Sequence, residues 1–410
     1  MKANILSVLI LCFSLAYGQV SPKLKIKKGN WIAQLQLSEN DALPFEVKVE
    51  KVNRSFRFSI ENGEESIVMQ DPILEGDSIR VHFPFFNSEL IFRMDGKKSF
   101  NGYWINYNKG NNYRIPLSAN RKRKAPRFFT KKDETPANVN GRWEVTFEPG
   151  TNGSYPAVGI FNQEEESNEV NGTFLTETGD YRFLAGVVTD DSLYLSCFDG
   201  SHAFLFKALL NDTLSGKFFS GKHWQSEWTA ERNETFELKS PDELTYIVDD
   251  QPVEFSLKDL KGNDYNFPND QLKGKVVIIQ IMGTWCPNCL DETIFYTELY
   301  ETYHEDGLEI ISIGYENGDE FTDYVANIQR LKEKLDLDFT FLVGGRANKV
   351  LASEQFSMLN EIISFPTSIY VDRHGMVKRI HTGFNGPGTG VYYQEYVEST
   401  YSLIESLLAD

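Results

Sequence analysis

The sequence predicts a multidomain protein with two antiparallel β modules, each a barrel or a sandwich, followed by an α/β domain. Between Trp31 and about Phe236, apolar and polar residues alternate as they do in half-buried strands. Short motifs recur within this half, which indicates an internal duplication. After about residue 240, apolar runs alternate with helical patterns, which is typical of a sheet covered by helices. We expect β modules over residues 19–130 and 131–239 and an α/β domain over 240–410.

The first 18 residues have the pattern of a secretory signal peptide. Lys2 gives a positive start, residues 5–15 form an apolar run, and Ala16 and Gly18 are small residues at the cleavage spacing. The run is too short to span a bilayer, which disfavours an uncleaved anchor. The sequence therefore predicts cleavage before Gln19 and an exported protein.

Charge and cysteine content narrow the function further. The net charge of −18 argues against nucleic acid or an anionic membrane as the main partner. We interpret the basic run at 121–124, which continues to Lys132, as a solvated linker. The predicted mature chain has only three cysteines, so structural disulfides do not hold it together. Cys197 lies in an alternating apolar run and is expected to be a buried core thiol.

Within the β half, alternation is clearest in the strands around 45–49, 56–60 and 79–83. The repeated motifs have nearly constant offsets, which favours duplication over chance. They pair residues 29–31 (GNW) with 141–143 (GRW), 77–79 with 191–193, 90–92 with 204–206, and 119–121 with 230–232. The sequence does not reveal the role of these modules.

The C-terminal half predicts a βαβ arrangement with helices on both faces of a central sheet. Helices are expected after residue 287, over 321–335 and 347–359, and at the C-terminus. Strands are expected at 253–260, 276–282, 308–313, 339–343, 368–371 and 377–381.

The motif WCPNC at residues 285–289 lies where a buried strand gives way to a helix. A cysteine at a helix N-terminus faces unpaired N–H groups and the positive end of the helix dipole, and both favour the reactive thiolate. Cys286 is the expected nucleophile, and Pro287 occupies an early helical position that tolerates its missing N–H. Cys289 comes from the next turn and can resolve a mixed disulfide, while Trp285 would shield the pair.

The alternative for this motif is half of a zinc site. Such a site needs two more ligands, which neither a second cysteine pair nor a nearby histidine supplies. We therefore expect neither a metal nor a cofactor. A second feature is Ser364-Phe365-Pro366-Thr367, in which a proline immediately precedes a strand. Such prolines make special turns, where cis peptides occur.

Together these motifs resemble the thioredoxin superfamily, and in particular the TlpA/ResA-type extracytoplasmic thiol–disulfide oxidoreductases. The resemblance covers about residues 241–410 and not the β modules. It is carried by residues 255–262 (FSLKDLKG), WCPNC, Pro366 in the place of the family's cis-proline, and residues 368–375 (SIYVDRHG). It implies a thioredoxin-like fold, a disulfide-containing protein as substrate, and a membrane or periplasmic electron donor. With the signal peptide, it also implies a place in the periplasm or cell envelope of a Gram-negative bacterium. Reduction is the favoured direction.

The resemblance also assigns roles to single residues. Cys286 attacks, Cys289 resolves, and Pro366 shapes the substrate groove, with Phe365, Thr367 and Pro287 as expected substrate contacts. Two further assignments stay open. Glu292 matches a glutamate that influences proton transfer with the resolving cysteine, or it is a helix N-terminal charge that favours the dipole. Ile294 and Phe365 depart from the family pattern, so the choice of substrate does not transfer.

Three rival functions remain. A peroxiredoxin needs Thr-x-x-Cys, but Thr284 is only two residues before Cys286. A Sco-like copper carrier would use the cysteines with His374 or His381, although Sco proteins space their cysteines by three residues. In the third, the β modules carry the main role as a binding or scaffold protein of the envelope. Their tryptophans could then form a binding face, although aromatic residues in barrels belong more often to the core: Trp31, Trp104, Trp143, Trp224 and Trp228.

Overall fold

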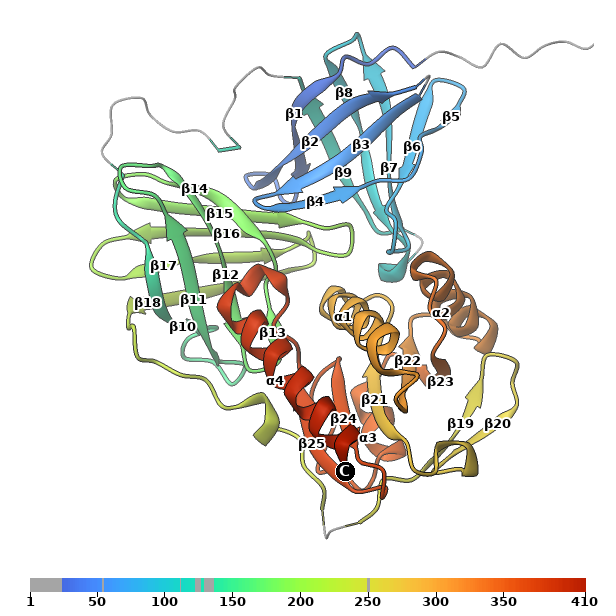
Figure 1. The fold of residues 1–410 in the computed structure, drawn as a ribbon. Helices are drawn as coiled ribbons and strands as arrows, with labels where there is room; N and C mark the ends of the chain where they lie inside the picture. Colours follow the sequence, from blue (N-terminus) through green and yellow to red (C-terminus); the bar gives the residue numbers. More distant parts are fainter. Residues whose placement is uncertain (1–23, 54, 111, 122–126, 129–135, 249–250) are drawn as a thin grey trace, which may run out of the picture.

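The computed structural model describes residues 24–410 except 54, 111, 122–126, 129–135 and 249–250 (Figure 1). The predicted signal peptide and most of the basic run at 121–132 lie outside these residues. The residues that the structure describes form three sheets: two antiparallel sheets of nine strands and a mixed sheet of seven. Among the residues described, no helix is long and apolar enough to cross a bilayer.

The first β module is an open antiparallel sheet in which the first and last strands pair, in the order β4-β3-β2-β1-β9-β8-β7-β6-β5. Alternation along its strands sends one set of side chains into the module, as in β1, where Trp31, Ala33 and Leu35 are buried. The strands are β1 (Gly29–Gln36), β2 (Ala42–Val52), β3 (Ser55–Asn62), β4 (Glu65–Val68), β5 (Ile73–Glu75), β6 (Ser78–His82), β7 (Ser88–Asp95), β8 (Ser99–Asn106) and β9 (Arg114–Asn120).

The second β module closes into a barrel, because β11 pairs with both β10 and β12. Closure leaves none of its eight main strands with an unpaired edge. The strands are β10 (Gly141–Phe147), β11 (Tyr155–Gln163), β12 (Glu169–Thr176), β13 (Gly179–Asp180), β14 (Leu184–Val188), β15 (Ser192–Phe198), β16 (Ala203–Leu210), β17 (Leu214–Ser220) and β18 (Trp224–Arg232).

The repeated GNW and GRW motifs make the same local contacts in both modules. The indole N–H of Trp31 donates to the carbonyl of Lys27 at 3.1 Å, and that of Trp143 donates to Val139 at 2.9 Å. In each module an arginine from the end of the sheet, Arg121 or Arg232, donates to the carbonyl just before the motif's glycine. Of the five tryptophans considered for a binding face, only Trp224 is exposed; the other four are buried.

The two modules are joined by a side chain of one inserted into the other. Phe198, at the end of β15, is fully buried against Phe45, Phe83 and Trp104 of the first module, with ring centroids 4.5, 5.4 and 5.1 Å away. Its backbone N–H and carbonyl both bond the amide side chain of Asn62, at 3.1 and 2.9 Å. The interior of the first module is therefore completed by a residue of the second.

The C-terminal domain contains the predicted central sheet, in the order β20-β19-β23-β22-β21-β24-β25, with β21, β22 and β23 parallel. Val276 and Ile278 of β21 pack with α1 and α4, whereas Val277 and Ile279 face the opposite side, where α3 packs. The elements are β19 (Phe255–Asp259), β20 (Asp264–Phe267), β21 (Val276–Met282), α1 (Pro287–Tyr303), β22 (Leu308–Glu316), α2 (Phe321–Leu335), β23 (Thr340–Arg346), α3 (Lys349–Gln355), β24 (Thr367–Val371), β25 (Val377–Thr382) and α4 (Val391–Ala409).

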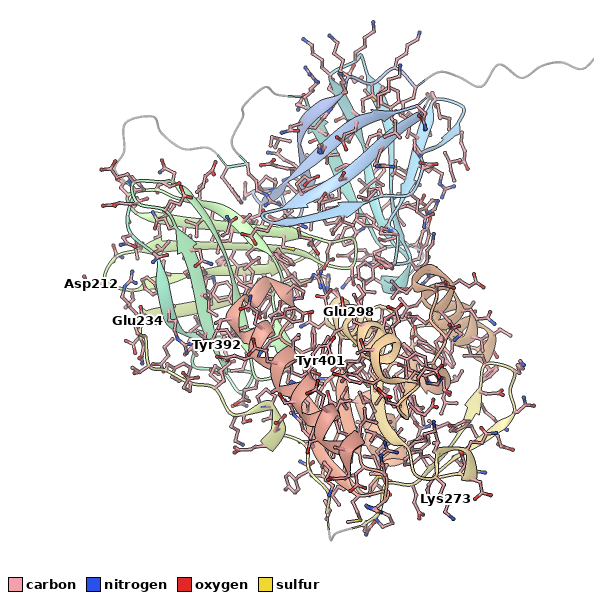
Figure 2. All side chains as sticks on the ribbon, viewed as in Figure 1. Asp212, Glu234, Lys273, Glu298, Tyr392 and Tyr401 are labelled. Atoms are coloured by element: carbon pink, nitrogen blue, oxygen red, sulfur yellow. The ribbon has the colours of Figure 1, made fainter. Side chains whose placement is uncertain are left out.

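The second β module also rests on this domain. Tyr392, labelled in Figure 2 near the start of α4, lies with its ring 5.6 Å from the guanidinium of Arg142 on β10. In Figure 1, β13 lies beside α4, and the first β module lies above α1 and α2. Buried apolar residues form one continuous cluster from the first β module through Phe198 to Met282 and Cys286.

Candidate active site

Cys286 occupies the N-cap of α1, directly after the strand β21 and its short loop. Its own N–H bonds the carbonyl of Gly283 at 3.1 Å, which closes the loop, and the N–H of Cys289 points at its Sγ, 3.4 Å away. Pro287 begins the helix and is buried. A helix N-terminal N–H aimed at the sulfur stabilises negative charge there. This local geometry suits Cys286 to act as a thiolate nucleophile.

The turn before β24 lies against the same sulfur. The Phe365–Pro366 peptide bond is cis, and the carbonyl of Phe365 lies 3.6 Å from Cys286 Sγ. The Phe365 ring is buried, stacked on Tyr315 at 5.3 Å, so its carbonyl rather than its ring faces the nucleophile. Thr367 is also buried and donates to the carbonyl of Ser364 at 2.9 Å. The substrate contacts expected of these residues stay predictions.

A buried carboxylate that the sequence analysis missed holds the loop before the motif. Glu316, at the end of β22, accepts bonds from the N–H and the hydroxyl of Thr284, at 2.8 and 2.6 Å. Burial raises the pKa of Glu316 to about 7. Trp285 is fixed by the bond from its indole N–H to the carbonyl of Tyr315 at 2.9 Å, and its ring lies 6.2 Å from that of Phe365.

Cys289 lies behind Cys286 and is fully buried. Burial raises the pKa of its thiol well above the usual range, and the neighbouring Cys286 and Glu292 raise it further. The three cysteines among the described residues are free thiols, and Cys197 is buried in the second module as expected. A buried thiol of high pKa must lose its proton to a nearby base before it can attack.

Glu292, three residues after Cys289 on α1, is a candidate for that base. It is fully buried on the face of α1 that packs on the sheet, and burial raises its pKa to about 7. Its carboxylate accepts hydrogen bonds from Gln280 at 2.9 Å, Ser368 at 3.1 Å and Tyr296 at 3.2 Å. Carboxyl groups buried to this depth, with a pKa near neutral, are common at functional sites, and the two roles expected of Glu292 stay predictions.

Three buried tyrosines extend this network away from the cysteines. The hydroxyl oxygen of Tyr370 lies 2.9 Å from those of Tyr296 and Tyr396, and the Tyr396 hydroxyl also donates to Glu292 at 3.4 Å. Burial raises the pKa of Tyr296 and Tyr396 well above the usual value, so both remain donors. The part that Tyr396 plays in this network was not predicted from the sequence.

The histidines considered for copper are placed differently. His381 is buried and its Nδ1 lies 2.6 Å from a carboxylate oxygen of Asp242, whereas His374 is exposed in the β24–β25 turn. Within the described part of the chain, no three metal-ligating side chains gather as they would around an ion.

Comparison with known proteins gives the C-terminal domain a family. Residues 248–394 match the Redoxin family model. Thiol-disulfide oxidoreductase ResA of Halalkalibacterium halodurans is 32% identical over 134 residues, which span 33% of this chain and 68% of the relative. ResA of Geobacillus thermodenitrificans is 29% identical over 130 residues, which span 32% of this chain and 66% of the relative.

Two solved structures also match. The match to a thiol:disulfide interchange protein of Chlorobium tepidum TLS covers 39% of this chain and 99% of that protein's chain, at 19% sequence identity and a TM-score of 0.28. The match to StoA of Bacillus subtilis covers 37% of this chain and 98% of the StoA chain, at 20% sequence identity and a TM-score of 0.27. On the sequence match to the ResA relatives, this chain belongs, through its C-terminal domain, to the ResA-type thiol–disulfide oxidoreductases of the thioredoxin superfamily.

Proposed function

We propose that the chain is an extracytoplasmic dithiol reductant of protein disulfides that works through Cys286 and Cys289. The observation that carries the proposal is the Cys286 sulfur, set between the N–H of Cys289 and the carbonyl of Phe365. A sulfur held there can attack a disulfide lying along the turn at Pro366.

The steps follow thiol–disulfide exchange. The Cys286 thiolate attacks one sulfur of the substrate disulfide, the substrate S–S bond breaks, and the second substrate sulfur leaves and takes a proton. Cys289 then gives its proton to Glu292 and attacks the Cys286 sulfur. The Cys286–Cys289 disulfide forms, the mixed disulfide between Cys286 and the first substrate sulfur breaks, that sulfur leaves as a thiolate and takes a proton, and two electrons have passed to the substrate. An external electron donor must then reduce the pair again.

We further propose that the β modules position this chemistry and that they arose by duplication. The shared strand order around β1 and β10 and the matching contacts of Trp31 and Trp143 support a common origin. Export is supported by the N-terminal residues 1–18.

The reduction potential of the pair, measured by glutathione equilibration of the full chain, tests the proposal. A value near or below roughly −250 mV, in the thioredoxin range, is expected of a reductant. A value near roughly −120 mV would make the protein a disulfide-forming oxidant instead. A Cys197→Ala variant should keep the wild-type potential. Failure of Cys286 and Cys289 to form a disulfide would refute the proposal and favour copper binding.

A further inference from the structure

Three loops of the C-terminal domain meet at the WCPNC motif, and the second β module contacts each of them. The loops are 283–287 with the motif, 364–367 with the cis-proline, and 383–386 after β25. The contacting residues belong to two segments, 176–182 around β13 and 198–202 between β15 and β16, which we call the cap. The cap therefore covers part of the surface around the motif.

The segment around β13 bonds two of these loops and the motif itself. The hydroxyl of Ser364 donates to the carbonyl of Thr178 at 3.3 Å, next to the cis peptide. The carboxylate of Asp180 accepts from the N–H of Gly386 at 2.7 Å and from the side-chain amide of Asn288, between the two cysteines, at 3.5 Å. The backbone of the cap therefore lies beside the turn where a substrate disulfide has to lie.

Glycines on both sides bring the backbones this close. A Cβ at Gly383, where φ is +79°, would meet the backbone of Thr178 at 2.5 Å, and one at Gly179 would meet the Asn288 amide at 2.5 Å. A Cβ at Gly388 would meet the backbone of Arg182 at 3.1 Å. Side chains at these positions would force the two surfaces apart. The glycines of the cap and of the C-terminal domain therefore allow the two surfaces to pack closely.

The second segment of the cap lies on the residue before Cys286. The Ser201 hydroxyl donates to the carbonyl of Trp285 at 2.8 Å. The first β module holds this turn in place, because Asn106 donates to the Ser201 carbonyl at 3.1 Å and Ser88 donates to that of Gly200 at 2.6 Å. Phe198, inserted into the first module, starts the same turn.

Arg182 fastens the cap to the helix that carries Cys289. Its buried guanidinium binds Asp291 of α1 and Glu65 of the first module, and it lies 3.5 Å from Asp199 in the second. Its backbone has φ of +60°, a costly conformation for a residue with a side chain. One cation thus joins all three parts of the chain beside the redox pair.

We propose that the cap determines which disulfides reach Cys286. In the capped state Cys286 is 9% exposed, so a small disulfide can enter, whereas a disulfide within a polypeptide meets the Thr178 backbone. Protein disulfides are exchanged only after the cap moves away, which requires release at Arg182. The inference rests on the proposed function and adds a substrate filter to it.

The test compares two substrates on the full-length, reduced chain: insulin as a protein disulfide and dithiobis(nitrobenzoate) as a small one. The variants are Arg182→Ala, which leaves the closed interface with unpaired carboxylates, and the milder Asp180→Ala. Arg232→Ala, an arginine of the same module away from the redox site, is the matched control. Both cap variants should raise the ratio of insulin to small-disulfide rate, Arg182→Ala by roughly tenfold, and the control should not.

Alkylation of Cys286 provides a second measurement that needs no substrate. The rate with a bulky polyethylene-glycol maleimide should rise in the cap variants much more than the rate with iodoacetamide. If Arg182→Ala fails to fold, the substrate and alkylation ratios of Asp180→Ala test the proposal instead. Unchanged ratios in folded variants would overturn the filter while leaving the redox function intact. Failure of the wild type with both disulfides would instead refute the proposed function.

Discussion

Replacement of Glu292 by glutamine should remove a pH-dependent loss of stability. The buried carboxyl has a pKa of about 7, against 4.5 for the ordinary group. A raised carboxyl pKa means that the folded state holds its proton while the unfolded state loses it. The free energy of unfolding therefore falls as the pH rises from about 4.5 to about 7 and is level above. Each pKa unit corresponds to about 1.4 kcal/mol, so the difference of 2.5 units costs about 3 kcal/mol.

Glutamine fits the site, because the surrounding hydroxyls of Tyr296 and Ser368 can turn to accept its N–H groups. Urea unfolding of wild type and Glu292→Gln at pH 4.5, 6 and 7.5 measures the effect. The difference between the two proteins cancels the titration of Asp291 and Glu316, whose pKa values burial also raises to about 7. The variant should gain about 3 kcal/mol relative to wild type between the two ends of this range. Parallel stability curves would show that Glu292 does not titrate there.

Glu292→Gln should also slow the attack of Cys289 on the mixed disulfide, so that the mixed disulfide with insulin persists longer in quenched reactions. An unchanged lifetime of the mixed disulfide would exclude Glu292 as the base. Cys289→Ser should accumulate that mixed disulfide, whereas Cys286→Ser should form none by mass spectrometry; a covalent adduct of Cys286→Ser would reverse the assigned roles. Tyr396→Phe removes a donor to the carboxylate and should raise the pKa of Glu292 further, shifting the pH range of the stability loss upward; a downward shift would contradict this role. Phe198→Ala should cost about 3–5 kcal/mol in urea unfolding, and a loss below about 1 kcal/mol would mean that the first module closes without it.

Local patterns were enough to predict the motif and its setting. A buried run ending at Met282, a glycine and a proline-started helix place Cys286 at an N-cap without long-range information, and the turn at Pro366 is likewise visible in the sequence. The contacts of the cap could not be predicted from the sequence, because Thr178 and Ser364 come from segments with no shared periodicity or charge pattern. Only the fold brings them together.

The burial of charged residues was equally hard to predict from the sequence. Glu292 was marked by the family resemblance, while Glu316 ends an apolar strand and reads as the start of a loop. Its role depends on the Thr284 backbone, which arrives from a neighbouring strand. Arg127 likewise belongs to a stretch interpreted as a solvated linker, yet it is buried and bonds Pro44 and Asn62. Burial of charge is decided by packing between segments, which no single stretch encodes.

The residue before the inserted Phe198 gives the protein an internal reporter. Cys197 is buried in the core of the second β module, and burial raises the pKa of its thiol well above the usual range, so it should not react with thiol reagents while that module stays folded. Cys289 is buried too, so native reduced protein should react first at Cys286, whereas denatured protein should react at Cys197 as well. Modification of Cys197 under native conditions would signal that the second module has opened, which is distinct from turnover at the redox pair. Every preparation can thus be checked for an intact second module before its activity is interpreted.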